Sequence, residues 1–343
     1  MALAMALPDS SRLAFAPGLE ICRLLAGMWQ VSGAHGRIDR ERALQAMREH
    51  FDCGFTTFDL ADHYGPAEDL VGELRRRLRA ERGEEALARL QTFTKWVPDP
   101  GPMTRPIVER AVEASLRRMD VPALDLLQFH WWDYGDTRYL DALRRLADLR
   151  ETGKIRYLAL TNFDTEHLEI VLGEGIPVIS NQVQYSLIDR RPEVAMSECC
   201  RRRRVHLLTY GTVAGGLLSE RYLGAPEPTR GELTTASLQK YRRMIDAWGG
   251  WALFQELLAA LDVVAKRHGA TIANVAARVI LDRPAVGGVI LGVRFGEAEH
   301  IAENSRVFDL TLEREDRERI EAVTSRSRDL FQTIGDCGDE YRH

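Results

Sequence analysis

The sequence predicts a single-domain (β/α)8 barrel, an α/β fold of the TIM-barrel class, from three observations. Short apolar runs alternate with longer segments of helical spacing, eight such units can be counted, and no glycine-rich phosphate loop follows the first run. This alternation indicates parallel strands joined by right-handed crossovers. An open, doubly wound sheet would also alternate, but it would carry G-x-G-x-x-G after its first strand. Gly27 and Gly33 are too far apart for that motif, so the closed barrel is favoured.

Eight strands are expected from β-branched and aromatic runs bounded by turn residues. They cover residues 21–27, 56–61, 91–96, 125–131, 157–162, 179–184, 206–210 and 288–292. Helices with acidic starts and basic ends are expected between them, for example over residues 39–48, 106–119, 139–151 and 164–172. The connection over residues 212–251 is unusually long and rich in glycine and proline, with helical spacing resuming at residues 254–268. We expect it to be a functional loop on the C-terminal face of the barrel.

The barrel domain is expected to span residues 18–330. Residues 1–17 are predicted to form a flexible N-terminal extension, and residues 331–343 a loosely ordered C-terminal tail, because chain ends are poorly ordered unless contacts hold them.

The composition is typical of a soluble globular protein. Of the 343 residues, 45% are hydrophobic and 28% are charged, and the net charge is −5. No basic surface for nucleic acid is indicated, and no segment approaches the ~20 apolar residues of a membrane span. Five cysteines without C-x-x-C spacing and an N-terminus without an export signal favour a reducing compartment. We therefore expect a cytoplasmic protein with no nucleic-acid or membrane partner, and the sequence leaves a homo-oligomer open.

Four reactive side chains lie at the ends of three consecutive predicted strands, where a barrel places its active site. Asp59 ends the second strand with Tyr64 five residues later, Lys95 ends the third strand, and His130 ends the fourth. An Asp or Lys at the end of an apolar strand is costly to bury unless the two form a pair. A lysine beside Tyr64 is expected to lower the pKa of that tyrosine, which makes it a usable general acid.

Each of these residues also has an ordinary structural explanation. A lone Asp–Lys pair is more often structural than catalytic, a tyrosine after a strand commonly anchors a loop, and His130 could be a core histidine. The four together at adjacent strand ends predict an active site.

The same residues carry a resemblance to a known family. The segment D-L-A-D-H-Y-G at residues 59–65, the Lys95 strand and the His130 strand resemble the tetrad of the aldo-keto reductase superfamily. The similarity covers residues 18–325 and is strongest to the branch of potassium-channel β-subunits and bacterial general-stress reductases. It continues through T-N-F at 161–163, N-Q-V-Q-Y-S at 181–186, G-G-L-L-S-E-R-Y at 215–222 and E-N at 303–304.

The resemblance implies a role for each tetrad residue. Tyr64 protonates the carbonyl oxygen, Lys95 lowers its pKa, Asp59 holds the lysine, and His130 orients the carbonyl. Hydride comes from C4 of the nicotinamide, so the cofactor carries the difficult step. The implied activity is the NADP(H)-dependent reduction of aldehydes or ketones to alcohols, or the reverse oxidation of an alcohol.

The resemblance also implies a cofactor site. Asn162 and Gln182 match residues that bind the carboxamide, and Tyr210 matches the aromatic that stacks on the nicotinamide. Gly215, Gly216, Ser219 and Arg221 match the pyrophosphate-binding segment, and Arg294 matches a basic residue that meets the 2′-phosphate. The remaining expected cofactor contacts are Met28, Trp29, Thr161, Gly211, Thr212, Gly292, His300, Glu303 and Asn304.

Some of these positions depart from the family pattern. His300 stands where relatives carry Arg or Gln, and a neutral histidine recognises phosphate less well than arginine. Gly211 stands where a serine is frequent, and Thr161 replaces a more common serine. NADP(H) is still favoured over NAD(H), because Arg294 remains and no acidic residue obviously replaces it.

Tryptophans near the strand ends predict an aromatic substrate pocket. Trp29, Trp96 and Trp131 are its expected lining, which suits small aldehydes or ketones, including aromatic ones. No metal site is expected, since the histidines and cysteines lack ligand spacing.

Two other functions compete with a carbonyl reductase. A cofactor-sensing regulatory subunit with slow turnover, which binds NADP(H) and a protein partner, fits the channel-subunit resemblance. A Schiff-base aldolase that uses Lys95 is disfavoured, because Asp59 would keep the lysine protonated.

Overall fold

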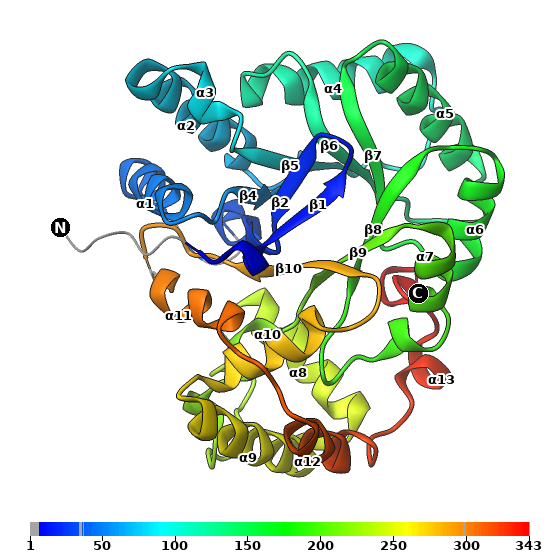
Figure 1. Cartoon of the computed structure of the whole chain (residues 1–343). Coiled ribbons are helices and arrows are strands. Elements are labelled where there is room, and N and C mark those ends of the chain that lie inside the picture. Colours follow the sequence, from blue (N-terminus) through cyan, green and yellow to red (C-terminus); the bar gives the residue numbers. More distant parts are fainter. Residues whose placement is uncertain (1–6, 34–35, 37, 298–299, 343) are drawn as a thin grey trace.

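The computed structural model describes residues 7–33, 36, 38–297 and 300–342, and it contains a closed barrel of parallel strands surrounded by helices (Figure 1). The barrel order is β10-β3-β4-β5-β6-β7-β8-β9, and β10 pairs with both β9 and β3 to close the ring. The strands are β3 (Leu24–Gly27), β4 (Thr57–Asp59), β5 (Gln91–Trp96), β6 (Leu124–Phe129), β7 (Ile155–Thr161), β8 (Val178–Gln184), β9 (His206–Tyr210) and β10 (Val286–Gly292). The predicted (β/α)8 fold is confirmed.

Helices follow the strands and cover the outside of the barrel (Figure 1). Those between consecutive strands from β3 to β9 are α1 (Arg40–Asp52), α2 (Ala67–Arg82), α3 (Glu84–Leu87), α4 (Arg105–Met119), α5 (Arg138–Glu151), α6 (Thr165–Gly173) and α7 (Met196–Arg203). Before and after β10 lie α8 (Ala236–Trp248), α9 (Gly250–His268), α10 (Ile272–Leu281), α11 (Ile301–Ser305), α12 (Arg314–Thr324) and α13 (Leu330–Ile334).

The amphipathic pattern of the sequence accounts for these helices. In α1, the side chain of Asp39 accepts from the backbone N–H of Arg42 and caps the helix, and Leu44, Met47 and Phe51 are buried at helical spacing. The strands are buried on both faces, because an apolar cluster fills the barrel and another lies between strands and helices. Loops at the C-terminal ends of the strands are thereby held on a rigid frame.

The N-terminal end of the barrel is closed by a β-hairpin. Strands β1 (Arg12–Ala16) and β2 (Leu19–Cys22) pair antiparallel, and Phe15 reaches into the barrel to within 6.0 Å of the Phe93 ring. The prediction of a flexible extension over residues 1–17 is therefore wrong for residues 12–16, while residues 1–6 lie outside the described chain. Residues 13–16 form a short apolar run that ends at Pro17 and Gly18, which is a pattern typical of a strand followed by a turn.

The long connection after β9 contains more helix than expected. Two short 3-10 turns, Ala214–Gly216 and Glu220–Tyr222, precede α8, which lies inside the predicted loop of residues 212–251. Tyr241, Ile245 and Trp248 of α8 are buried in a second apolar cluster with α9. The glycines and prolines before α8 obscured this helical spacing in the sequence.

The C-terminal tail is also more ordered than predicted. Residues 331–342 include the end of α13 and a 3-10 turn, Asp339–Tyr341, and Cys337 is buried. Asp336 Oδ2 accepts from the Thr165 N–H at the start of α6, and Arg191, in the turn before α7, donates to Glu340 Oε2. The prediction of a loosely ordered tail is corrected, because polar contacts with β7, β9 and the loop after β8 hold these residues.

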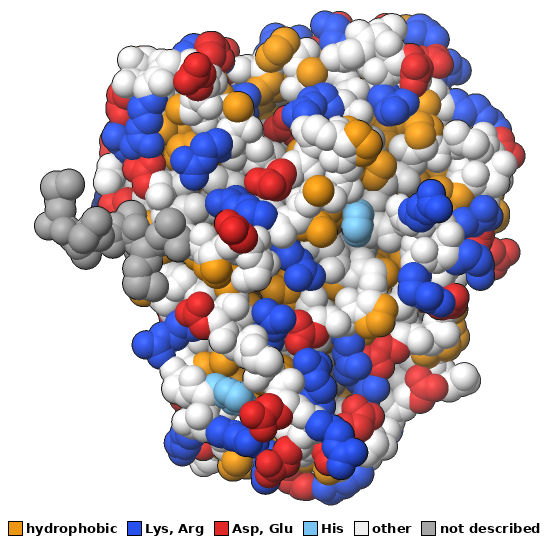
Figure 2. Space-filling view, viewed as in Figure 1, with side chains coloured by type: hydrophobic (Ala, Val, Ile, Leu, Met, Phe, Trp, Pro, Cys, Tyr) orange, Lys and Arg blue, Asp and Glu red, His pale blue; other side chains and the backbone are white. Residues whose placement is uncertain are grey.

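The surface carries mixed charges. Figure 2 shows Lys and Arg side chains interspersed with Asp and Glu on the face with the hairpin, without an extended basic area on that face. Among the described residues, none of the helices combines the length and the apolar character needed to cross a membrane.

Candidate active site

The four reactive residues predicted from the sequence come together at the C-terminal ends of β4, β5 and β6. Lys95 Nζ donates to Asp59 Oδ2 at 2.6 Å and to the Leu60 carbonyl at 3.0 Å. The same nitrogen lies 5.2 Å from the centre of the Tyr64 ring. Asp59, Lys95 and His130 are each only 3% exposed, so their mutual contacts replace water.

The second oxygen of the Asp59 carboxylate organises two amides. Gln128 Nε2 and Gln182 Nε2 donate to Asp59 Oδ1 at 2.9 and 2.7 Å, and Gln182 Nε2 also donates to Gln128 Oε1 at 2.7 Å. An ionised carboxylate only accepts, so both amides must turn their NH2 groups toward it. Gln182 is thereby left with its carbonyl oxygen as the group that it can offer to a ligand.

His130 is a neutral imidazole in this structure. Its Nδ1 lies 3.1 Å from the Thr161 carbonyl, which can only accept, so Nδ1 carries the proton. Burial lowers the pKa of His130 to about 4, and Nε2 has no hydrogen-bond partner among the described residues. The free Nε2 is therefore an acceptor, suited to the hydroxyl of an alcohol rather than to a carbonyl oxygen.

The environment of Tyr64 differs from the prediction. We expected the lysine to lower the pKa of Tyr64, but burial raises this pKa well above 10, and the Asp59 carboxylate adds to the rise. Burial also lowers the pKa of Lys95, although the ion pair with Asp59 opposes that effect. Tyr64 consequently keeps its proton in this state of the site and can act as a donor once negative charge develops nearby.

A cavity of about 300 Å³ opens at this end of the barrel and is lined by the tetrad. The expected cofactor and substrate residues that also line it are Trp29, Thr161, Asn162, Gln182, Tyr210, Gly211, Thr212, Gly215 and Gly292. Most of the predicted nicotinamide end is therefore assembled around the tetrad.

The predicted substrate pocket needs correction at two tryptophans. Trp96 and Trp131 are 7% and 0% exposed and do not line the cavity, while Val97 and Trp132 do. Side chains alternate along a strand, so the cavity side of β6 continues through His130 to Trp132 and leaves Trp131 outside. Trp131 Nε1 instead donates to the Asp133 and Asp136 carbonyls. The same alternation excludes Trp96.

The remaining expected cofactor residues lie away from this cavity. Met28 is fully buried, Ser219 donates to the Gly216 carbonyl at 2.8 Å, and Arg221 lies over the ring of Tyr222. Gly211 and Gly215, which do line the cavity, have positive φ angles and approach α8 so closely that an added Cβ would lie 2.6 and 2.9 Å from Tyr241. These glycines serve the packing of the loop on α8.

The predicted adenine end is formed by polar residues, of which Arg294 and His300 are exposed and Glu303 and Asn304 are partly buried. Arg294 lies two residues after the end of β10, whereas His300 Nδ1 lies 3.1 Å from Glu303 Oε2. Glu303 Oε1 also accepts from Thr271 Oγ1, and Asn304 lies in α11. His300 and Glu303 thus form an ion pair whenever the histidine is protonated.

Besides Val97 and Trp132, sequence reasoning missed other residues of the cavity region, among them Gln128, Lys240 and Tyr341. Gln128 shares the cavity side of β6 with His130, so strand alternation could have found it. Lys240 comes from α8 and Tyr341 from the tail, and both line the cavity. Their spacing in sequence carries no signal for this contact.

Comparison with known proteins finds similarity over most of the chain. The profile of the Aldo/keto reductase family matches residues 23–325. Aldo-keto reductase YhdN of Bacillus subtilis (strain 168) is 28% identical over 339 residues, covering 94% of this chain and 95% of that protein. Flagellar radial spoke protein 5 of Chlamydomonas reinhardtii is 26% identical over 297 residues, and the match spans 70% of this chain and 56% of that protein.

A solved structure shares the fold. The aldo/keto reductase from Klebsiella pneumoniae, crystallised in complex with NADP and acetate, matches with a TM-score of 0.67 and 22% identity. The match covers 92% of this chain and 95% of that chain.

Proposed function

Since this chain belongs to the aldo/keto reductase family, we propose that it transfers a hydride between NADP(H) and the carbonyl carbon of an aldehyde or ketone, with Tyr64 as the proton donor. Membership makes the protein an oxidoreductase. The observation that carries the finer proposal is the arrangement of Lys95, bound to Asp59 at 2.6 Å and placed 5.2 Å from the Tyr64 ring.

The cavity residues fit a nicotinamide ring with its carboxamide. A carboxamide has one donor group and one acceptor group. Gln182 has its carbonyl oxygen left to accept from the NH2, because Asp59 and Gln128 hold its own NH2. Asn162 Oδ1 accepts from the Tyr210 hydroxyl at 2.9 Å, so Asn162 has its NH2 left to donate to the carboxamide oxygen. The two amides are complementary to the two ends of the group.

A bound nicotinamide would supply the hydride from C4. Tyr64 then gives its proton to the carbonyl oxygen, and the Lys95 ammonium beside the ring stabilises the phenolate that remains. Asp59 keeps the ammonium in place and charged. The neutral His130 accepts from the new hydroxyl through Nε2, which holds the alcohol oxygen near Tyr64.

The aromatic wall of the cavity supports small, planar or apolar carbonyl substrates. Trp29 and Trp132 line it together with Tyr341, and Trp132 lies 4.3 Å from the His130 ring. We propose NADP(H) over NAD(H) because Arg294 is an exposed cation after β10.

The test is steady-state oxidation of NADPH and of NADH by the purified protein with a panel of small aliphatic and aromatic aldehydes and ketones. We expect turnover with NADPH and a lower kcat/KM with NADH. Binding of NADPH without turnover of any member of the panel would contradict the reductase and support a regulatory, cofactor-binding role. A tenfold preference for NADH would overturn the phosphate-site assignment.

A further inference from the structure

The C-terminal tail, residues 336–342, lies against the predicted cofactor residues instead of extending into solvent. Four of its residues contact them or the cavity directly, namely Gly338, Glu340, Tyr341 and Arg342. The family profile ends at residue 325, so the tail is a feature outside the matched region.

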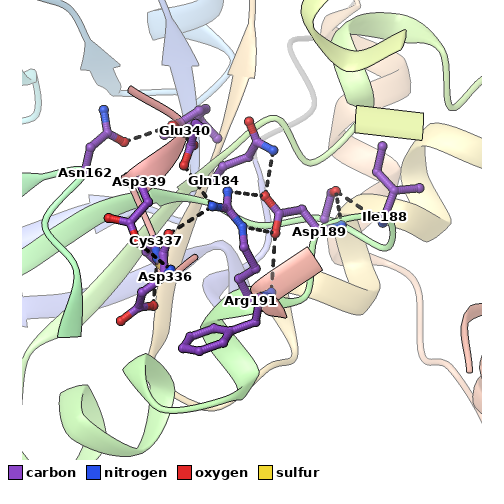
Figure 3. Close-up of polar contacts among 12 residues, drawn as sticks. Asn162, Gln184, Ile188, Asp189, Arg191, Asp336, Cys337, Asp339 and Glu340 are labelled. Atoms are coloured by element: carbon purple, nitrogen blue, oxygen red, sulfur yellow. Dashed lines mark hydrogen bonds and ion pairs between the residues drawn. The ribbon is translucent and has the colours of Figure 1, made fainter. Parts of the chain in front are cut away.

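A buried ion cluster anchors the tail. Arg191, with a side chain only 1% exposed, makes a two-armed contact with Asp189 and donates to the Asp336 carbonyl and to Glu340 Oε2, both at 2.9 Å. Figure 3 shows Arg191 between Asp189 and these tail residues. Burial alone would raise the pKa of Glu340, but the Arg191 and Lys240 cations outweigh it and lower that pKa. A satisfied ionic cluster of this kind holds the tail in one defined geometry.

The anchored tail places Tyr341 in the cavity. Its hydroxyl lies 3.1 Å from the hydroxyl of Tyr210 and accepts a hydrogen bond from Lys240. The Lys240 ammonium also lies over the rings of Tyr210 and Tyr341, at 5.1 and 4.6 Å. Tyr210 is thus held at its hydroxyl end by the tail.

The tail also holds Asn162. Arg342 Nη2 donates to the Asn162 carbonyl at 2.7 Å and to the Trp131 carbonyl at 3.0 Å. Gly338 packs so closely on the same peptide that an added Cβ would lie 2.1 Å from the Asn162 oxygen. Asn162 has a φ of 57°, in the left-handed region that non-glycine residues enter at a cost unless their surroundings hold them there.

These contacts converge on one pair of residues. The Asn162 side chain is tied to the Tyr210 hydroxyl, its backbone is tied to Arg342, and the Tyr210 hydroxyl is tied to Tyr341. We propose that the C-terminal tail is a positioning element of the nicotinamide site, in which Arg342 and Tyr341 hold Asn162 and Tyr210 in the orientation that receives the ring. This inference rests on the proposed function, since Asn162 and Tyr210 must face the nicotinamide.

The proposal separates the two ends of the cofactor. Loss of a tail contact loosens the residues at the nicotinamide, whereas the expected adenine-end residue His300 is held by Glu303 in α11 and should keep its surroundings. A ligand that lacks the ring should therefore be indifferent to the tail. If the tail merely stabilised the fold, loss of a tail contact would weaken binding of both kinds of ligand. If the tail plugged the site, the same loss would tighten binding of the dinucleotides.

The experiment is isothermal titration of the full chain with NADPH and NADH, and with 2′-phospho-ADP-ribose and ADP-ribose, which lack the nicotinamide. The variants are Arg342→Ala, Arg342→Lys and Tyr341→Phe, with Arg326→Gln as the control. Arg326 pairs with Glu256 on the surface and has 56% of its side chain exposed. Tyr341→Phe removes one hydroxyl and keeps the ring, so it tests the proposal even if Arg342→Ala unfolds.

We expect Arg342→Ala to weaken binding of the preferred dinucleotide about tenfold, because a charged donor to two carbonyls is lost. Tyr341→Phe should weaken it severalfold, Arg342→Lys should restore part of the loss, and the ring-less ligands and Arg326→Gln should be unchanged. Equal weakening of both kinds of ligand, no change, or tighter dinucleotide binding would each overturn the proposal. If the unmodified protein binds neither dinucleotide, the proposed function fails and this inference with it.

Discussion

Lys95 and Asp59 form one buried ion pair of this barrel, Arg191 and Asp189 form another, and their surroundings differ. Lys95 lines the cavity, contacts two oxygens and lies beside Tyr64. Arg191 is not among the cavity-lining residues, and its guanidinium is shared among Asp189, Glu340 and a backbone carbonyl. The compact ammonium of Lys95 can still act on the neighbouring Tyr64. The planar guanidinium of Arg191 has all its contacts filled by acceptors, so it holds the surrounding structure in place. Equal burial therefore does not imply an equal role.

Removing the Lys95 cation should have the largest effect. We expect Lys95→Met to lower kcat about 10³-fold, because the Tyr64 phenolate loses its stabilising charge. The unpaired Asp59 should also lower the free energy of unfolding by about 3–5 kcal/mol. The double variant Lys95→Met/Asp59→Asn should regain stability in a denaturant titration without regaining turnover. Recovery of turnover in the double variant would show that Lys95 does not act on Tyr64.

Removing the structural cation should mainly affect stability. Arg191→Met leaves Asp189 and Glu340 unpaired, and we expect a loss of about 3 kcal/mol in the free energy of unfolding. At saturating cofactor, kcat should fall much less than in Lys95→Met. Arg191→Lys should regain only part of the stability, since it cannot make the two-armed contact. A kcat loss as large as that of Lys95→Met would remove the distinction between the two pairs.

Substitution of His130 tests whether burial keeps this side chain neutral. Its pKa is about 4 in the folded chain and 6.5 when unperturbed, so the unfolded chain binds its proton first as the pH falls. The free energy of unfolding therefore keeps its full value with respect to His130 above pH 6.5, and it decreases progressively as the pH falls toward 4. Between pH 7 and pH 5 we expect the protein to lose about 2 kcal/mol more stability than His130→Gln does. The measurement is chemical denaturation at both pH values. If the unmodified protein and His130→Gln lose the same free energy of unfolding, His130 is not held neutral.

Substitution of Gln128 tests which group Gln182 turns toward the cavity, and it should give the smallest effect. In Gln128→Leu, Gln182 keeps Asp59 as a partner but loses the second acceptor that fixes its orientation. Binding of NADPH should weaken about tenfold, while its 3-acetylpyridine analogue, which lacks the carboxamide NH2, should weaken less. Gln45→Leu on the surface of α1 is the matched control. If the ratio of the affinities for NADPH and its analogue is the same in Gln128→Leu as in the unmodified protein, the assigned orientation of Gln182 is wrong.

The fold and the tetrad could be predicted because their signals are local. Alternating apolar runs mark the strands, and Asp59, Lys95 and His130 stand at strand ends whatever lies beyond them. The period-two rule, applied strictly, would also have identified Gln128 and Trp132 and excluded Trp96 and Trp131. The sequence therefore contained the information needed to place these four side chains correctly.

The tail was unpredictable for a different reason. Its contacts join Arg342 to Asn162 and Glu340 to Arg191, pairs separated by 180 and 149 residues. Nothing in the sequence near Tyr341 shows that the ring enters the cavity. The raised pKa of Tyr64 was missed likewise, because burial depends on everything packed around the ring, including the tail residue Tyr341.

The most direct test of the central claim is single-turnover hydride transfer, followed by the loss of NADPH fluorescence after mixing with an accepted aldehyde. The variants are Tyr64→Phe and, as a matched control, Tyr157→Phe, whose hydroxyl donates to Pro17 at the opposite end of the barrel. If Tyr64 is the proton donor, Tyr64→Phe should slow the step about 10²–10⁴-fold with little change in NADPH affinity, and Tyr157→Phe should leave it unchanged. Hydride transfer in Tyr64→Phe within about threefold of the unmodified protein would contradict that role.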